Sequence, residues 1–370
     1  MADLKDEKRP QFGGRFLTDA SQVFQHNAWD NVSWDEAQEA EARLKVESNT
    51  KTKVSEAQQR KYEEEAARYW DEFYSQHQNR FFKDRHWLFV EFPELAADQV
   101  ALMTPDSPSY DKQESSLKEH SSKVLDHLTS KTDKKLVGSE NEVLPVESDT
   151  NQKEMHANAV HLQSSSQEGY PGSSSTLQIF EVGCGVGNTV LPVLRTNNNP
   201  NLYIYGCDLS SQAVEILKEQ PDYDPCRCHV FACDVTDPNS VLPFPDKSLD
   251  VIVLIFVLSA INPERFQFTI NRLASYLKPG GMIVFRDYGR YDLAQLRFKD
   301  GQSLGDNFYV RGDGTRVYFF TQDKLRELFT KAGLVEVQNI TDRRLQVNRS
   351  RQLKMYRVWI QCKYRKPAAS

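Results

Sequence analysis

The sequence is poor in cysteine and has no long apolar run. It contains six cysteines in 370 residues, and their spacing matches neither a metal-binding Cys-x-x-Cys pair nor a disulfide framework. We therefore expect no metal site, and reduced thiols in and around buried strands. The longest apolar run, residues 251–260, is far shorter than the ~20 residues of a membrane-spanning helix. We expect no membrane span.

The first eight residues lack both the apolar core of a secretory signal and the Arg/Ser-rich pattern of a transit peptide. Instead they mix acidic and basic side chains. This pattern favours a cytosolic or nuclear protein, and we predict a cytoplasmic location.

The last part of the chain is short of acidic residues. Residues 284–370 hold 18 Lys and Arg against 9 Asp and Glu, a surplus of +9 in a chain whose formal net charge is −6. Residues 343–366 hold nine basic residues and no acid. A basic end of this kind can bind nucleic acid. On charge alone, a solubilising surface explains it equally well.

Residues 104–176 contain 15 serines and no Phe or Trp. Such a segment cannot bury enough apolar surface to offset the entropy lost on ordering, so we predict a disordered linker. The chain then divides into an amino-terminal region (1–103), the linker (104–176) and a carboxyl-terminal domain (177–370).

Hydrophobic periodicity predicts an α/β fold after the linker and a helix before it. Aromatic residues recur at helical spacing over residues 54–82. Predicted strands cover residues 177–182, 202–206, 229–232, 249–258, 282–286, 334–340 and 355–364, and predicted helices cover 211–219, 263–277 and 321–332. This alternation is typical of a mostly parallel, doubly wound sheet with helices on both faces. The last two strands are suited to antiparallel pairing at the sheet edge.

A glycine-rich turn at residues 183–187 follows the first of these strands. Glycines let a backbone pass close to a ligand. The spacing is Gly-x-Gly-x-Gly, and Asn188 replaces the third glycine of a dinucleotide fingerprint, which favours S-adenosylmethionine over a nicotinamide. Asp208 ends the second strand, where it would accept hydrogen bonds from ribose hydroxyls. Asp234 ends the third strand beside the expected adenine, and for either acid alone a helix cap is the alternative.

The segment after the fourth strand, residues 254–263, lacks the Asn/Asp-Pro-Pro-aromatic motif of many enzymes that methylate exocyclic amines. The absence of this motif favours an acceptor nitrogen that already exposes a lone pair, such as N3 of cytosine. Methylation there creates a cation, which a nearby carboxylate would stabilise. Asp287 is the predicted catalytic acid, and a structural ion pair with Arg286 or a neighbouring base is the alternative.

Several blocks resemble the enzymes that make 3-methylcytidine at position 32 of the tRNA anticodon loop. They are residues 69–74, 82–87, 181–188, 254–260, 285–289, 307–316 and 318–321. Residues 26–34 resemble the branch that modifies threonine and arginine tRNAs. The resemblance implies a class I, Rossmann-like methyltransferase with a seven-stranded, mostly parallel sheet and a helical, tRNA-binding amino-terminal region.

The resemblance also implies roles for individual residues. Trp70 and Tyr74, which share a helix face, would form a lid over S-adenosylmethionine. The other implied cofactor contacts are Gly183, Asp208, Asp234, Val235 and Ile255. Arginines that grip phosphates and an aromatic that stacks on a flipped base are implied at Arg297, Arg311, Arg316, Tyr318, Arg349 and Arg351. Simple surface exposure is the alternative for each of these.

Our leading hypothesis is S-adenosylmethionine-dependent methylation of cytosine N3 at position 32 of threonine, and also arginine, tRNAs. A tRNA-binding subunit that works mainly through a partner and a protein or small-molecule methyltransferase are the alternatives. The anticodon arm of tRNA is the expected ligand of residues 1–103, of the insertion at 290–320 and of the basic end. The resemblance implies a protein partner with an arginyl-tRNA-synthetase-like anticodon-binding domain, or as a second choice seryl-tRNA synthetase.

Overall fold

The computed structural model describes residues 14–85, 87–96 and 169–368. Most of the predicted linker, 104–176, lies outside the described residues. The described residues form a single compact unit around a central sheet. None of the described helices combines the length and the apolarity needed to cross a membrane.

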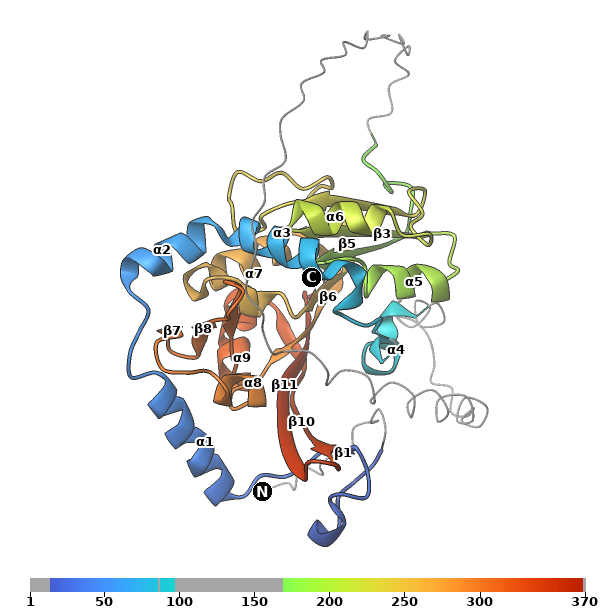
Figure 1. The fold of residues 1–370 in the computed structure, drawn as a ribbon. Helices are drawn as coiled ribbons and strands as arrows, with labels where there is room; N and C mark the ends of the chain where they lie inside the picture. The colour runs from blue at the N-terminus through green and yellow to red at the C-terminus, as the bar shows by residue number, and fades with distance from the viewer. Residues whose placement is uncertain (1–13, 86, 97–168, 369–370) are drawn as a thin grey trace, which may run out of the picture. The chain divides into compact units, whose positions relative to one another are not determined.

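The central sheet has the strand order β1-β10-β11-β6-β5-β2-β3-β4 (Figure 1). Its strands are β1 (Ala28–Asp30), β2 (Leu177–Val182), β3 (Leu202–Asp208), β4 (Cys228–Ala232), β5 (Leu249–Ile255), β6 (Leu277–Tyr288), β10 (Val335–Asn348) and β11 (Leu353–Arg365). Strands β4, β3, β2, β5 and β6 run parallel, whereas β11, β10 and β1 are added antiparallel. The seven predicted strands and the antiparallel final pair are confirmed.

The eighth strand, β1, was not predicted. It pairs with β10 at the sheet edge, where Trp29 lies opposite Leu345. Trp29 is buried against Val23, Leu345 and Val347, and its indole N–H donates to the carbonyl of Val23 at 2.8 Å. The amino-terminal region is therefore part of the sheet, which joins two of the three regions predicted from the sequence.

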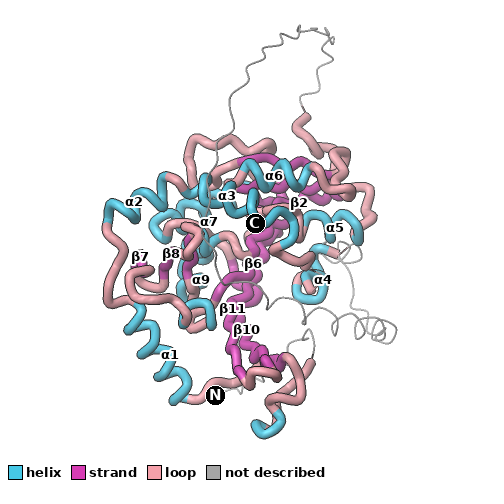
Figure 2. Tube along the Cα trace, in the orientation of Figure 1, coloured by secondary structure: helices cyan, strands magenta, loops and turns pink. Residues whose placement is uncertain are grey.

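Helices cover both faces of the parallel strands (Figure 2). On one face lie α7 (Phe266–Tyr276) and α9 (Gln322–Lys331), and on the other lie α4 (Leu88–Glu91), α5 (Val190–Thr196) and α6 (Ser211–Lys218). Alternate residues of β5 point to opposite faces, as a strand requires: Ile252 and Leu254 pack with α7 and α9, and Val251 and Val253 pack on the opposite side. Strands covered on both faces must be apolar throughout, which explains the continuous apolar runs in the sequence.

The helix predicted over residues 54–82 is two helices, α2 (Glu56–Glu64) and α3 (Ala66–His77). Glu65 separates them because its φ and ψ of −99° and 15° are not helical. A further helix, α1 (Glu36–Asn49), precedes them and is capped by the Asp35 carboxylate.

The insertion between β6 and α9 carries a short helix, α8 (Leu293–Leu296), and a small antiparallel sheet that was not predicted. Its strands are β7 (Ser303–Gly305), β8 (Phe308–Val310) and β9 (Arg316–Tyr318). Apolar residues of this small sheet pack against Val54 and Tyr62 of the amino-terminal region. The insertion and the segment that contains α2 therefore lie side by side, next to the carboxyl end of β5.

Candidate active site

The glycine turn after β2 is closely fitted to its surroundings. Gly183, Gly185 and Gly187 have φ of 67°, 51° and 92°, in the left-handed region that favours glycine. A Cβ atom at Gly183 would lie 2.5 Å from Cγ2 of Val257, and one at Gly185 would lie 2.6 Å from the Tyr74 hydroxyl. The turn therefore leaves no room for side chains at these two positions.

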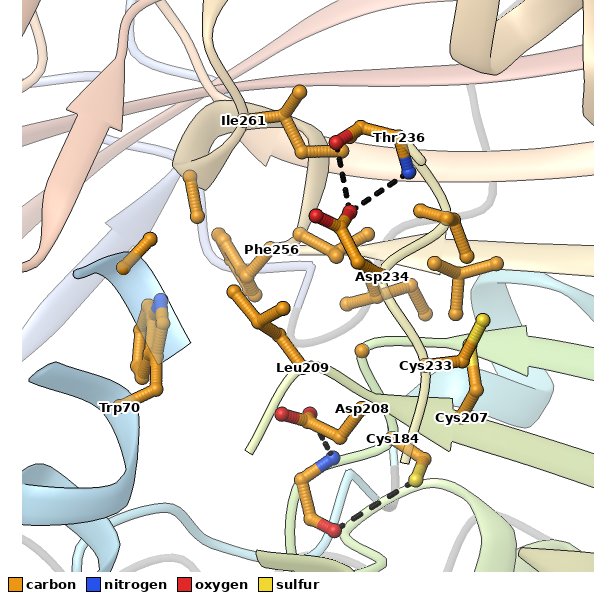
Figure 3. A pocket seen from close by; sticks show the side chains of 18 of the residues that line it. Trp70, Cys184, Cys207, Asp208, Leu209, Cys233, Asp234, Thr236, Phe256 and Ile261 are labelled. Carbon is orange, nitrogen blue, oxygen red and sulfur yellow. Dashed lines mark hydrogen bonds between the residues drawn. The ribbon is translucent and has the colours of Figure 1, made fainter. Parts of the chain in front are cut away.

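A cavity of about 120 Å³ lies at the carboxyl ends of the parallel strands, above this turn (Figure 3). Parallel α/β sheets bind their ligands at this edge. All seven residues predicted to contact a cofactor line the cavity: Trp70, Tyr74, Gly183, Asp208, Asp234, Val235 and Ile255. The structure thus brings together residues that are up to 185 positions apart (255 − 70 = 185).

Asp208 ends β3 inside the cavity. One carboxylate oxygen accepts from the Gly185 amide at 2.8 Å and the other accepts from the Ser210 amide at 2.9 Å. Burial raises the pKa of Asp208 to about 6, although both amide hydrogen bonds oppose this shift. The carboxylate is fixed to the glycine turn and still lines the cavity, so it can accept further hydrogen bonds from a bound ligand.

Asp234 lies across the cavity from Asp208, just after β4. One of its oxygens accepts from both the amide and the hydroxyl of Thr236, at 2.8 and 2.7 Å. These bonds hold the carboxylate in place, and the other oxygen lies toward the cavity (Figure 3). The Asp208 and Asp234 carboxylates are thus two fixed hydrogen-bond acceptors, one at the end of β3 and one just after β4. Their positions fit the hydroxyls of a ribose and the amine of an adenine, which are donors.

The α3 helix forms one wall of the cavity. Trp70 and Tyr74 line it, and Phe73 on the same helix packs against α6 residues such as Ile216. Asp71 fixes the helix, because its carboxylate accepts from the Ser210 hydroxyl at 2.6 Å and from the Gln212 amide at 3.1 Å. No pattern in the sequence indicated this contact, since an acid on an exposed helix face is common.

Arg85 brings a positive charge to the cavity wall. Its Nη1 donates to Glu181 at 3.2 Å and to the Thr189 hydroxyl at 2.6 Å. Burial raises the pKa of Glu181 to about 7, and the Arg85 charge opposes this shift. Arg85 lies in the block at residues 82–87 that carries the family resemblance, but it was not predicted to be a site residue.

Asp287, the predicted catalytic acid, is fully buried and is not among the residues that line the cavity. Its carboxylate accepts from the Ser259 amide at 2.9 Å and from the Tyr288 amide at 2.8 Å. Burial raises its pKa to about 6. Through the Ser259 amide, the carboxylate anchors the segment at residues 256–262, and residues of this segment line the cavity.

Of the alternative for Asp287, an ion pair with Arg286 or a neighbouring base, the Arg286 part is wrong. Arg286 points to the other side of β6, as neighbouring strand residues must, and it donates to Asp342 at 2.5 Å and to Gln361 at 2.7 Å. A direct catalytic role for Asp287 stays a prediction.

A second cavity, of about 460 Å³, adjoins the first. It is bounded by the small sheet of the insertion, the loop after β5 and α2, and two of the predicted RNA contacts, Arg316 and Tyr318, line it. Lys53 and Lys324 also line it. No group of metal-ligating side chains is found in the described part of the chain.

The other four predicted RNA contacts lie elsewhere. Arg297 is exposed at the end of α8, and Arg349 and Arg351 are exposed in the turn between β10 and β11. Arg311 folds back on its own loop, where it donates to the Thr315 hydroxyl and to the Arg316 carbonyl. The six residues therefore do not form one contiguous patch.

Comparison with known proteins finds a matching family model, relatives in sequence and solved structures. Residues 180–283 match the family described as a methyltransferase domain. A mouse protein, tRNA N(3)-cytidine methyltransferase METTL2, is 55% identical over 100% of this chain and 92% of its own length. A Saccharomyces cerevisiae protein, tRNA(Thr) (cytosine(32)-N(3))-methyltransferase, is 39% identical over 96% of this chain and 46% of its own. A solved SAM-dependent methyltransferase from Methanosarcina mazei, 16% identical, covers 52% of this chain and 93% of its own at a TM-score of 0.40.

Proposed function

The chain belongs to the tRNA N(3)-cytidine methyltransferase family, and we propose that it methylates N3 of cytosine 32 in the anticodon loop of threonine tRNA. The observation that carries this proposal is the 55% identity with a relative of that name along the whole chain. Arginine tRNAs are proposed as further substrates. Since tRNA is the substrate, we propose that the protein acts in the cytoplasm.

The cofactor is S-adenosylmethionine, which supplies an electrophilic methyl group when bound. In this proposal, Asp208 accepts hydrogen bonds from the ribose hydroxyls. The Asp234 oxygen that lies toward the cavity accepts a hydrogen bond from the adenine amine. Val235 and Ile255 provide apolar walls. The support for this assignment is that both carboxylates are held by backbone amides at the wall of a single cavity.

The remaining contacts close the site around the amino-acid end of the cofactor. Gly183 allows a close approach of the backbone, and Trp70 and Tyr74 cover the cavity from α3. Arg85 offers a positive charge for the cofactor carboxylate, since it lines the same cavity and its guanidinium has donors beyond the two in use. We assign Asp287 the role of a positioning residue that acts through the Ser259 amide.

For tRNA, we propose two kinds of contact. Arg297, Arg349 and Arg351 bind phosphates, because they are exposed and lie outside both cavities. Arg316 and Tyr318 bind the acceptor nucleotide, and Arg311 supports their loop. Residues 1–103 and residues 177–370 both bind the anticodon arm, and we assign no tRNA contact to residues 104–176.

A protein partner is part of the proposal. The preferred partner has an arginyl-tRNA-synthetase-like anticodon-binding domain, and seryl-tRNA synthetase is the second choice. A protein inactive alone that gains activity when the first partner is added would support this assignment. Full activity of the isolated chain would argue against any required partner.

The central test uses purified protein, S-adenosylmethionine labelled in its methyl group and threonine tRNA transcripts. Nucleoside mass spectrometry should find the label in 3-methylcytidine. A transcript with uridine at position 32 should take up no label. Label recovered only in protein or in another nucleoside would overturn the proposal.

A further inference from the structure

Three residues line both cavities: Glu63 of α2, Asn262 of the loop after β5, and Arg316 of β9. They come from three distant parts of the sequence, and together they form the boundary between the proposed cofactor cavity and the second cavity. Any base that receives a methyl group from the first cavity while lying in the second must meet this boundary.

Glu63 is hydrogen-bonded to both of the other side chains. One Glu63 oxygen accepts both from Nη1 of Arg316 and from Nδ2 of Asn262, the latter at 3.1 Å. Asn262 is oriented by its own oxygen, which accepts from the Glu264 amide at 3.1 Å. The Arg316 side chain is 8% exposed and that of Glu63 is 39% exposed. The pair thus places a positive charge inside the protein and a carboxylate at its open side.

The two charged groups complement the pairing edge of cytosine. On that edge N3 lies between an amino group, which donates, and the O2 carbonyl, which accepts. A carboxylate accepts from the amino group and a guanidinium donates to the carbonyl. Uracil has a carbonyl in place of the amino group, and a carboxylate repels it.

The cavity behind this boundary fits a nucleotide. Phe308 and Tyr318 provide aromatic surface, with ring centroids 6.4 Å apart, and Lys53 and Lys324 provide positive charge. Aromatic rings stack on flipped bases and lysines bind phosphates. The features needed to hold a base with its pairing edge toward the first cavity are therefore present on the second cavity's wall.

We propose that Glu63 and Arg316 read the acceptor base, with Glu63 accepting from the amino group of cytosine and Arg316 donating to its O2. N3 then lies at the boundary and faces the cofactor cavity. This inference rests on the proposed function and assigns residues to its specificity.

The same arrangement gives Glu63 a part in the methyl transfer. The N3 lone pair forms the new bond to the methyl carbon, and the carbon–sulfur bond breaks with its electrons going to sulfur. The positive charge passes from sulfur to the base, and no proton has to leave. A carboxylate bound to the amino group stabilises the cation that develops on the base. Glu63 thus supplies a carboxylate close to the acceptor nitrogen.

The test measures discrimination between cytosine and uracil in binding as well as in catalysis. Full-length protein is titrated, without cofactor, with an anticodon stem-loop RNA that carries either cytidine or uridine at the acceptor position. The wild type should prefer cytidine by about tenfold, the discrimination of a good paired contact. Glu63→Gln should lose most of this preference, because an amide can accept from cytosine or donate to uracil. Its kcat on cytidine RNA should fall by at least about tenfold.

Matched variants separate base reading from general damage. Glu64→Gln changes the adjacent, exposed glutamate of α2 and should behave as the wild type. Arg316→Lys keeps the charge but loses the planar fork, so it should lose preference for cytidine. Binding of S-adenosylhomocysteine, measured by calorimetry, should be unchanged in all three variants.

Two outcomes would overturn the inference. One is a Glu63→Gln variant that keeps the cytidine preference, and the other is a variant whose S-adenosylhomocysteine affinity falls in step with its kcat, since Glu63 would then only support the cofactor cavity. A wild-type protein that methylates no cytosine even when the first proposed partner is added would instead contradict the proposed function. The two failures are therefore distinguishable.

Discussion

The hydroxyl of Tyr74 lies 2.6 Å from the point that a Cβ atom at Gly185 would occupy. One residue belongs to α3 in the amino-terminal region, and the other belongs to the glycine turn after β2, 111 positions later in the sequence (185 − 74 = 111). The lid and the turn are thus fitted to each other at atomic distance. The correct shape of the cofactor cavity depends on both.

We expect Gly185→Ala to impair cofactor binding. The new methyl group meets the Tyr74 hydroxyl, and alanine is strained by roughly 1–2 kcal/mol at a left-handed φ. Affinity for S-adenosylhomocysteine, measured by calorimetry, should fall by more than about tenfold, since moving the lid costs at least the ~1.4 kcal/mol of a tenfold change.

Gly301→Ala is the control for strain alone, because Gly301 has a φ of 85° and nothing within 4 Å of an added Cβ. It should lose stability but keep cofactor affinity. Adding Tyr74→Phe to Gly185→Ala should restore part of the affinity. If the double variant binds no better than the single one, the contact between lid and turn is not the cause.

Cofactor affinity should fall as the pH drops below about 6. The pKa of Asp208 is raised to about 6 by burial, and the ionised carboxylate is the form that accepts ribose hydroxyls. Below this pKa a proton must leave on binding, so affinity falls by up to about tenfold per pH unit. Calorimetry with S-adenosylhomocysteine between pH 5 and 8 measures this effect.

Asp208→Asn should bind S-adenosylhomocysteine weakly, and its affinity should not change with pH. Asp234→Asn should also bind it weakly but keep the pH dependence of the wild type. A wild-type affinity that is flat between pH 5 and 8 would be inconsistent with Asp208 as a ligand contact.

We expect Asp287→Asn to destabilise the protein by roughly 1–3 kcal/mol, because an amide nitrogen would face a backbone N–H and leave a buried donor unsatisfied. The wild-type carboxyl also adds a pH dependence. Its folded-state pKa is raised to about 6, so its stabilising contribution is present at low pH and is lost as the pH rises through 6.

The stability gap between wild type and Asp287→Asn should therefore be larger at pH 5 than at pH 7, by about 1 kcal/mol. Urea unfolding at both pH values measures it. A gap that is equal at pH 5 and pH 7 would show that the buried carboxyl does not titrate in this range.

Replacing Arg349 and Arg351 together by glutamine should weaken tRNA binding in a salt-dependent way. Both side chains are exposed in the β10–β11 turn. Each lost phosphate contact should make the slope of log affinity against log salt shallower by about 1. Filter binding of threonine tRNA over a series of salt concentrations gives this slope.

The matched control replaces two exposed lysines on other elements, Lys218 of α6 and Lys331 of α9, by glutamine. The slope should then stay as in the wild type. An equal change in both double variants would mean that only net charge matters.

Much of the sheet could be predicted because its strands carry continuous apolar runs. The run predicted at 177–182 is β2, Leu177–Val182, to the residue. The residues that line the cofactor cavity could also be predicted, since the last residues of parallel strands lie at one edge of the sheet. Asp208 and Asp234 could be assigned to that edge before their side-chain contacts were known.

Contacts between distant segments were missed. Glu63 and Arg316 are 253 positions apart and carry no local pattern that links them. The small sheet of β7, β8 and β9 has strands of three residues each, which are too short for a period of two to be visible. Asp287 was predicted to be a site residue from its place at the end of a strand, and the sequence did not indicate that its side chain is fully buried.

The pairing of β1 with β10 has a consequence for how the chain is made. Trp29 and its partner Leu345 are separated by 316 residues (345 − 29 = 316), so most of the protein is synthesised before this contact is possible. Until then the apolar side chains near Trp29 have no sheet to cover them, and long-range pairing of this kind forms late. The edge strand therefore makes synthesis of the chain through Leu345 a condition for completing the fold.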